Sequence, residues 1–199
     1  MWHRFLLFIV VVACISIRTA YADDGATYSR SLLVVSPELR MNAFETADDR
    51  TISDFELHLG LGLDWPGYRY VSFEGYIGAG IICGLQESFK YRYHNEIQRT
   101  KAIGSVHLKA VVDIHTSGRF ISLTGAFRAQ MAFVSGRTGL YTVEAAPGIT
   151  IRPFDQRNQI LRTVAFRTNV WFCIIDDFDK VFDIQRSLVN PGIEVLVGF

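Results

Sequence analysis

The feature of this sequence that most constrains its fold is an alternation of apolar and polar residues with a period of two. Every second residue from Phe55 to Trp65 is apolar, and the residues between them are charged, polar or glycine. A helix would scatter these apolar side chains around its circumference, whereas a β-strand places all of them on one face. The alternation therefore predicts a strand with two different faces. Similar alternation occurs over residues 105–114, 121–133, 141–152 and 189–199.

The chain contains eight strand-like segments, joined by connections that alternate in length. Transmembrane barrels have short periplasmic turns and longer outer loops, and bacterial barrels have an even number of strands. We therefore predict an all-β fold, an eight-stranded antiparallel up-and-down transmembrane β-barrel with both chain ends on the periplasmic side. Short connections lie at 66–68, 116–119 and 155–158, longer ones at 41–53, 86–103 and 175–187, and a short exception at 135–138. The predicted strands are 28–40, 54–65, 69–85, 104–114, 120–134, 139–153, 160–174 and 188–199.

A soluble eight-stranded barrel or a two-sheet sandwich that binds a small ligand would also alternate. The architectures differ in which face lies inside. Over much of this chain the apolar face is almost free of charge, whereas the other face carries small residues and isolated charges of both signs. The outer surface of a soluble protein usually carries lysine and glutamate throughout. The pattern therefore favours a membrane barrel with its apolar face outward.

The N-terminus has the features of a cleavable signal peptide. Arg4 provides a positive charge, an almost uninterrupted apolar stretch ends at Ile17, and Ala22 completes an Ala-Tyr-Ala sequence with small residues before the cut. The apolar stretch is shorter than the about 20 residues that a membrane-spanning helix needs. We predict a signal peptide at 1–22 and the outer-membrane barrel at 23–199. Lipidation of Cys14 in place of cleavage at Ala22 is the alternative.

Charge and cysteine content argue against several function classes. Lys+Arg and Asp+Glu are both 20, so the formal net charge is zero and no surface for nucleic acid is indicated. Only Cys83 and Cys173 follow the predicted signal peptide, which is too few for a disulfide framework. The acidic run at 176–179 lacks the glycine and glutamate spacing of an EF-hand and is predicted to be a solvated loop. The sequence therefore predicts no metal site and no cofactor.

The end of the chain resembles the last strand of bacterial outer-membrane proteins. The run from Gly192 to Phe199 (GIEVLVGF) has apolar residues at alternate positions and an aromatic residue at its end. The predicted mature chain resembles the small eight-stranded group that includes the OmpA transmembrane domain, OmpX and OmpW. Its Asn190-Pro191 entry to the last strand is most similar to OmpW-like proteins. The resemblance implies a bacterial outer-membrane location and recognition of the strand ending at Phe199 by the barrel assembly machinery.

Charged residues on the polar face of the predicted barrel would lie in its lumen. An eight-stranded barrel is only just wide enough to be filled by its own side chains. An isolated buried ion costs several kcal/mol, so these charges are expected to pair and plug the barrel. Arg128 and Glu144, at similar depth on neighbouring strands, are the first pair expected. The predicted lumen residues are Glu56, His58, Glu74, His107, Lys109, Asp113, Arg128, Glu144, Arg152, Arg167 and Glu194.

Pro37, Pro147 and Pro191 fall within predicted strands, although proline cannot donate to the hydrogen-bond ladder of a closed barrel. We expect these prolines at bulges or strand ends. A central position for Pro147 would mean that the predicted register of its strand is wrong. The third predicted strand is interrupted by several glycines, which indicates a sharp bend in the wall.

The connection at 86–103 is the main predicted surface site. Its basic and aromatic residues suit an anionic sugar or phosphate at the outer surface, and a solvated loop is the alternative. The predicted binding residues are Lys90, Tyr91, Arg92, Tyr93, Arg99 and Lys101.

Three functions remain open. The favoured one is a structural or surface-interaction barrel that contacts outer-membrane lipid and a host or surface ligand through its outer loops. The alternative is a porin, a narrow channel for small solutes or, as the OmpW-like similarity implies, for hydrophobic molecules. The distant alternative is a lipid-modifying enzyme, since His115-Thr116-Ser117 is similar to the His-x-Ser motif of outer-membrane lipid A deacylases. That triplet precedes Gly118 and is predicted to be a turn, so no catalytic residue is predicted.

Overall fold

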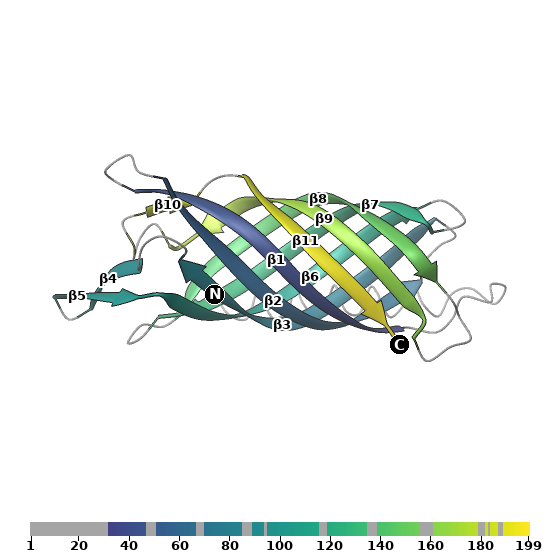
Figure 1. Cartoon of the computed structure of the whole chain (residues 1–199), viewed down its shortest axis with the longest axis horizontal. Coiled ribbons are helices and arrows are strands. Elements are labelled where there is room, and N and C mark those ends of the chain that lie inside the picture. The colour runs from purple at the N-terminus through teal and green to yellow at the C-terminus, as the bar shows by residue number, and fades with distance from the viewer. Residues whose placement is uncertain are drawn as a thin grey trace.

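The computed structural model shows a long barrel whose strands run obliquely to its axis (Figure 1). The structure describes residues 32–46, 51–66, 70–84, 89–93, 95–115, 119–134, 139–155, 161–178, 182, 184–186 and 189–199. The predicted signal peptide at 1–22 lies outside the described residues, so its cleavage and the alternative at Cys14 stay predictions.

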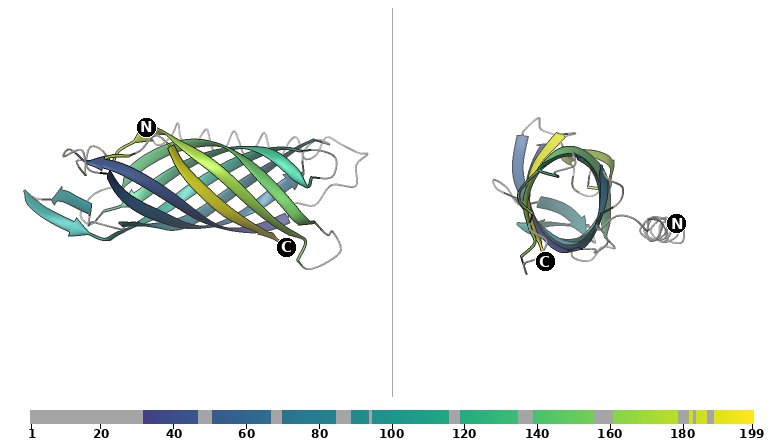
Figure 2. Two further views of the ribbon diagram at one scale, coloured as in Figure 1. Left: turned by 45° about the horizontal axis from the view of Figure 1, so that its top comes forward. Right: turned by 90° about the vertical axis from the view of Figure 1, so that its right-hand side faces the viewer.

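The wall of the barrel confirms the predicted fold class. Its strands pair antiparallel with their sequence neighbours, and β1 pairs with both β2 and β11, which closes the sheet into an eight-stranded barrel. A view along the axis shows the strands closed into a ring (Figure 2). Closure leaves no open sheet edge. The wall strands are β1 (Leu32–Thr46), β2 (Thr51–Pro66), β3 (Val71–Gly84), β6 (Ala102–His115), β7 (Ile121–Phe133), β8 (Leu140–Asp155), β9 (Thr163–Asp176) and β11 (Val189–Gly198).

Short strands extend the wall at one end, which we call the hairpin end. β4 (Phe89–Tyr93) and β5 (Glu96–Thr100) pair with each other as a hairpin that projects beyond the barrel (Figure 1). β10 (Ile184–Arg186) pairs with the last residues of β1. The first strand therefore continues to Thr46 instead of ending near residue 40. The other end of the barrel, where β11 finishes, we call the C-terminal end.

Among the described residues, no helix is long and apolar enough to cross a membrane.

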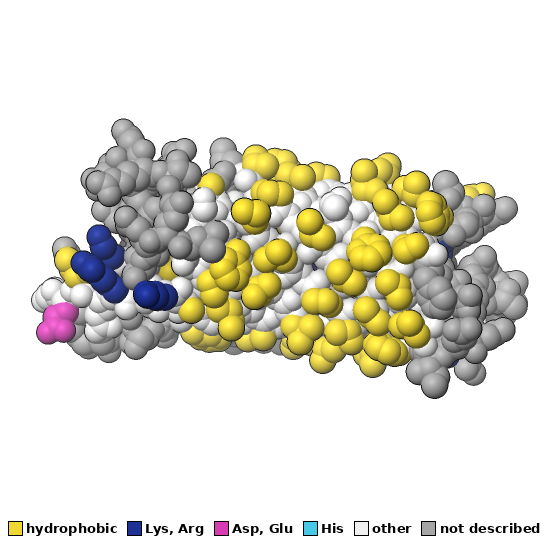
Figure 3. Space-filling view, in the orientation of Figure 1, with side chains coloured by type: hydrophobic (Ala, Val, Ile, Leu, Met, Phe, Trp, Pro, Cys, Tyr) yellow, Lys and Arg dark blue, Asp and Glu magenta, His cyan; other side chains and the backbone are white. Residues whose placement is uncertain are grey.

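The two faces of the wall have the polarity that the alternation predicts. In β7, for example, Ser122, Thr124 and Arg128 are buried, whereas Ile121 and Leu123 are exposed. Every wall strand exposes apolar side chains near its middle, so an apolar belt surrounds the barrel. Figure 3 shows one side of this belt. The ionised side chains lie inside and the wall is apolar outside, the reverse of the usual arrangement in a soluble protein. One exposed residue per strand defines the belt: Leu39, Leu59, Ile77, Val112, Leu123, Ile149, Phe166 and Ile193.

The prolines lie inside the strands, and the expectation about Pro147 is wrong. Pro147 lies near the middle of β8 and pairs with Gly125 of β7, while the β8–β9 pairing is interrupted beside it. Residues on both sides of it keep their predicted faces, so the register is retained. The β1–β11 pairing is likewise interrupted at Pro37 and has ended before Pro191. Each proline lies where one of its two ladders is interrupted or finished, which is how a closed barrel accommodates a residue without an N–H donor.

Glycines on the inner faces of β2 and β3 provide space for bulky side chains. A Cβ atom on Gly78 would lie 2.5 Å from the ring of His107, and one on Gly80 would lie 2.2 Å from the ring of His58. A Cβ atom on Gly62 would lie 2.4 Å from the ring of Tyr76. These glycines therefore admit rings into a lumen that has little width to spare.

Candidate functional site

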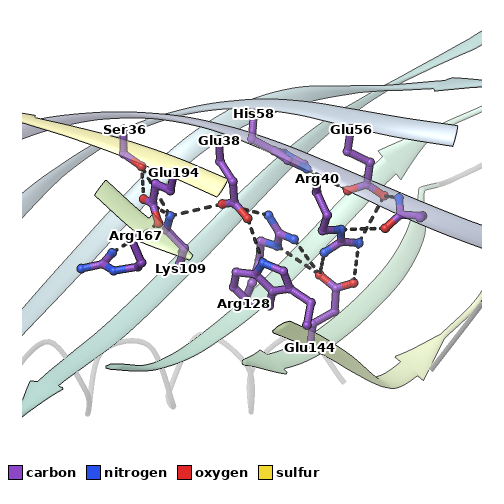
Figure 4. A network of polar contacts seen from close by, with 12 residues as sticks. Ser36, Glu38, Arg40, Glu56, His58, Lys109, Arg128, Glu144, Arg167 and Glu194 are labelled. Atoms are coloured by element: carbon purple, nitrogen blue, oxygen red, sulfur yellow. Dashed lines mark hydrogen bonds and ion pairs between the residues drawn. The ribbon is translucent and has the colours of Figure 1, made fainter. Parts of the chain in front are cut away.

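The barrel interior holds a continuous network of ion pairs between side chains from different strands (Figure 4). The side chain of Arg40 is fully buried, and its two terminal nitrogens donate to both carboxylate oxygens of Glu144 on β8, at 2.7 Å each. The same guanidinium lies 3.3 Å from the carboxylate of Glu56 on β2. Arg40 therefore joins β1 to β8, which are not neighbours in the wall.

Arg128 of β7 extends this network. Its guanidinium lies 3.0 Å from the carboxylate of Glu144, its register partner on β8, so the predicted Arg128–Glu144 pair is confirmed. Arg128 also lies 3.4 Å from the carboxylate of Glu38 on β1. A carboxylate oxygen of Glu38 lies 3.4 Å from Lys109 Nζ on β6 as well. Glu38 thus bridges cations from two strands.

The network continues toward the C-terminal end. Lys109 Nζ lies 2.5 Å from the carboxylate of Glu194, which also accepts a hydrogen bond from the Ser36 hydroxyl. The guanidinium of Arg167 lies 3.3 Å from Glu194 and 2.7 Å from Glu74. Positive and negative groups therefore alternate along the lumen, with contributions from the whole circumference of the wall.

Arg152 of β8 completes the network. Its guanidinium lies 3.2 Å from the carboxylate of Glu74 and pairs with Asp113 of β6. No charged residue of the network is more than 4% exposed. Buried ions require partners, because desolvating an unpaired ion costs several kcal/mol. Here each cation touches at least one carboxylate, so every buried positive charge has a counter-charge inside the barrel.

The structure places every predicted lumen residue in the interior. Those that join ion pairs are Glu56, His58, Glu74, Lys109, Asp113, Arg128, Glu144, Arg152, Arg167 and Glu194. His107 is buried and, among the described residues, joins none of these ion pairs. Its ring meets that of His58 edge to face, with centroids 5.0 Å apart.

Sequence reasoning missed two central members of the network, Glu38 and Arg40. Both lie on β1, whose alternation in the sequence is less regular than that of other strands. The alternation that would have identified them is nevertheless present in the sequence. Ser36, Glu38 and Arg40 alternate with apolar residues and with proline, and all are buried.

Two aromatic side chains pack into the network and fill space between the ions. Trp171 is fully buried and donates from Nε1 to the carboxylate of Glu38 at 2.9 Å. The guanidinium of Arg128 lies over its ring, 4.1 Å from the centroid. Lys109 Nζ lies 4.7 Å from the ring centroid of Tyr76. These cation–π contacts stabilise the cations beyond their pairing with carboxylates.

The hairpin end of the lumen is filled differently, by an apolar cluster. Phe178 and Phe182, from the segment that follows β9, are 0% and 1% exposed. Their rings stack with centroids 5.5 Å apart, and Phe182 lies 5.8 Å from the ring of Phe89 at the start of β4. The remaining members come from inward positions at the ends of wall strands: Ile82, Ile103, Ala132, Val134 and Leu140.

The acidic segment at 176–179 is only partly the solvated loop that its composition predicts. The Asp176 carboxylate accepts a hydrogen bond from the Phe178 N–H at 2.8 Å, and this arrangement directs the Phe178 side chain into the apolar cluster. In the part of the chain that the structure describes, no group of three or more His, Cys, Asp and Glu side chains is placed to hold a metal ion.

The C-terminal end of the lumen carries a separate ion pair. Arg119, in the turn before β7, has a positive φ of 52° and extends its side chain to the Asp64 carboxylate at 3.0 Å. Its guanidinium also donates to the Ser72 hydroxyl at 3.0 Å. This pair retains more solvent exposure than the central network, at 13% and 7% of the two side chains.

The predicted surface residues lie on the β4–β5 hairpin. Lys90 and Arg99 are exposed and are register partners, and Lys101 is exposed just after β5. Tyr91, Arg92 and Tyr93 belong to β4, and their side chains lie outside the described part of the chain. His115 ends β6, while Thr116 and Ser117 lie outside the described residues, so the interpretation of the His-x-Ser triplet as a turn stays a prediction.

Comparison with known proteins adds no relative: no protein-family model, no curated protein and no solved structure matches this chain.

Proposed function

We propose that this protein is an integral β-barrel of a bacterial outer membrane, closed inside by its ion-pair network, with a structural or surface-interaction role exerted at the hairpin end. The observation that carries the proposal is the inverted polarity of the wall, with ionised side chains inside and an apolar belt outside. The fold by itself does not specify a role, because one fold supports many functions.

The apolar belt supports the membrane location. Soluble monomers rarely expose continuous apolar patches of more than a few hundred Å². Here the exposed apolar side chains surround the barrel, and several of them, including Leu59, Ile77 and Leu123, are more than half exposed. Contact with lipid hydrocarbon would remove this surface from water, at a gain of roughly 25 cal/mol per Å². The exposed aromatic ring of Phe199, at the end of β11, suits recognition by a barrel assembly machinery.

The ion-pair network supports a closed lumen. A path for solutes requires room along the axis, but Arg40 and Arg128 both contact Glu144 inside the barrel, at 2.7 and 3.0 Å. Moving any of these side chains aside would separate buried opposite charges, at a cost of several kcal/mol. The apolar cluster around Phe178 and Phe182 adds a second closure at the hairpin end.

A charge placed in the apolar belt tests the membrane location. Leu59→Arg puts a cation on the outer face of β2, which costs about 2–4 kcal/mol at the bilayer midplane. We expect a strong loss of folding into lipid vesicles, measured by the gel mobility of unheated samples. Ile97→Arg, at the exposed hairpin outside the belt, is the matched control and should fold like the unchanged chain. Equal folding of both variants, with solubility in the absence of detergent, would contradict the proposal.

Electrical recording tests the closed lumen. Residues 23–199 refolded in detergent and inserted into planar bilayers should show no discrete current steps, with insertion verified separately. Replacing Arg40, Arg128 and Glu144 by alanine, together with Phe178 and Phe182, removes both closures and should produce conductance. Leu123→Ala, on the lipid-facing side, is the control and should stay silent. Discrete steps from the unchanged chain that alter on Arg128→Ala would replace this proposal with the narrow-channel function.

A further inference from the structure

Basic side chains gather on the β4–β5 hairpin, in a part of the molecule that the ion-pair network does not use. Lys90, Arg99 and Lys101 are all exposed. Lys90 and Arg99 lie directly opposite each other in the register, and Lys101 follows Arg99 by two residues, at the bend between β5 and β6. Lys and Arg side chains lie between the hairpin tip and the apolar belt (Figure 3).

The pairing of Lys90 with Arg99 is unfavourable without a counter-charge. Directly opposed residues of an antiparallel pair have their Cβ atoms about 5 Å apart, and like charges at that separation destabilise the hairpin. Within the described residues, neither cation has an ion-pair partner. An anion held between them would convert this repulsion into attraction, and phosphate oxygens match both ammonium and guanidinium donors.

The base of the hairpin is fixed against the barrel, so these cations have a defined position. Phe89, the residue before Lys90, is 5% exposed and packs on Phe182 in the apolar cluster. The Lys101 carbonyl accepts a hydrogen bond from the Gly84 N–H at 3.1 Å, which attaches it to the end of β3. The patch is therefore a continuation of the wall and not a freely moving loop.

Lys101, the cation of the patch nearest the apolar belt, lies at the height of the lipid headgroup layer. Lys90 and Arg99 lie further out on the hairpin, and their long side chains can extend back toward that layer. On this side of the barrel the belt ends near Ile81 and Phe133, which both pair with Gly104 of β6. Lys101 precedes Gly104 by three residues, which is about 10 Å along a strand and about 8 Å along the axis of a barrel with strands tilted by about 40°. The headgroup region extends roughly 5–8 Å beyond the hydrocarbon on each side.

We infer that Lys90, Arg99 and Lys101 form a binding surface for lipid phosphate groups at the rim of the barrel. This inference rests on the membrane location proposed above. The hairpin would anchor the hairpin end of the barrel to phosphorylated lipid of the facing leaflet, and the binding would weaken with added salt, since exposed charges are screened.

Native mass spectrometry of the folded barrel in detergent tests the inference. The unchanged chain should retain bisphosphorylated lipid A more strongly than monophosphorylated lipid A, and phosphatidylcholine least. Lys90→Gln, Arg99→Gln and Lys101→Gln combined should reduce retention of bisphosphorylated lipid A at least tenfold, because each basic residue near an anionic surface contributes roughly fivefold. Equal retention by this triple variant would overturn the inference.

Control variants separate charge from fold. Lys90→Arg with Lys101→Arg keeps the charge and should keep the retention. Arg162→Gln removes a cation near the C-terminal end, where its backbone N–H bonds to the Gly198 carbonyl, and should leave retention unchanged. Glu96→Gln removes an exposed acid from the same hairpin and should not weaken retention. Loss of retention in Arg162→Gln equal to that in the triple variant would mean that net charge alone is responsible and would overturn the site.

Competition with free phosphate distinguishes binding of lipid phosphate groups from binding of soluble phosphate. Inorganic phosphate at the same phosphate concentration should not displace bisphosphorylated lipid A. Full displacement would assign the patch to soluble phosphate and overturn the lipid assignment. A chain that is folded and soluble without detergent would overturn both the membrane location and this inference. A chain that folds only in detergent, with retention insensitive to the triple substitution, would overturn this inference alone.

Discussion

The middle of the lumen and its hairpin end are filled in different ways by the same eight strands. The inward positions of β3 change from Glu74 and Tyr76 to Ile82 as the strand approaches the hairpin end. Those of β6 change in the same direction, from Asp113 and Lys109 to Ile103. The middle of the lumen is thus held together by ion pairs and the hairpin end by apolar contacts. Phenylalanines from the segment after β9 complete the apolar cluster at the hairpin end.

The ion pairs in the middle of the lumen and the apolar cluster at its hairpin end differ in how strictly they require particular residues. Apolar packing requires mainly the right volume, and volume-conserving changes usually cost little. A buried ion pair requires a specific partner at a specific place, because a single unpaired ion is far more costly than the pair. The ionic middle should therefore be intolerant of single changes, whereas the apolar end should tolerate conservative ones.

The largest effect is expected from Glu144→Gln. This change removes the carboxylate shared by Arg40 and Arg128 and leaves two buried cations without it. We expect the free energy of unfolding to fall by about 3–5 kcal/mol, measured by urea unfolding in lipid vesicles with tryptophan fluorescence. Glu96→Gln, on the exposed hairpin, is the control and should change stability by less than about 0.5 kcal/mol. A loss below about 1 kcal/mol for Glu144→Gln would refute the idea that each buried ion of the network needs its specific partner.

The next effect is expected at the apolar end. Phe182→Ala should lower the free energy of unfolding by about 3 kcal/mol, because it leaves a cavity against Phe89 and Phe178. Phe182→Leu preserves most of the volume and should cost less than about 1.5 kcal/mol. The same urea titration measures both. If the leucine variant were as unstable as the alanine variant, the apolar end would not be the tolerant region.

A smaller effect is expected from an added methyl group on the inner face of β3. Gly78→Ala would place a Cβ atom 2.5 Å from the His107 ring and should cost about 1–3 kcal/mol. Gly104→Ala is the matched control, since its Cβ atom would meet nothing within 4 Å. We expect this control to be neutral in the same assay. Comparable losses for the two variants would show that space for the His107 ring does not determine the effect.

The smallest effect is expected from Arg119→Gln at the C-terminal end. Its pair with Asp64 is partly exposed to solvent, so the loss should be about 1 kcal/mol or less. Added salt should reduce this difference, because exposed charges are screened, while the effect of Glu144→Gln should persist. Unfolding measured at low and high sodium chloride makes the distinction. A salt-independent loss would place Arg119 with the central network.

Much of this architecture follows from the sequence alone. The alternation with a period of two determined the strands and their faces, because side-chain direction in a strand depends only on local backbone geometry. It also placed Arg128 opposite Glu144, since neighbouring strands joined by a short connection have a nearly determined register. The less regular β1 was the exception, and Glu38 and Arg40 were missed there.

Only the tertiary structure decided which residues meet across the lumen. Arg40 contacts Glu144, and Lys109 contacts Glu194, through strands that are not neighbours in the wall. Such contacts depend on closure of the sheet and on the stagger of all its strands, quantities that no local pattern contains. The burial of Phe178 beside acidic residues was hidden for the same reason, because its partners come from distant strand ends. Local periodicity determined the wall of this protein, and closure of the barrel determined its interior.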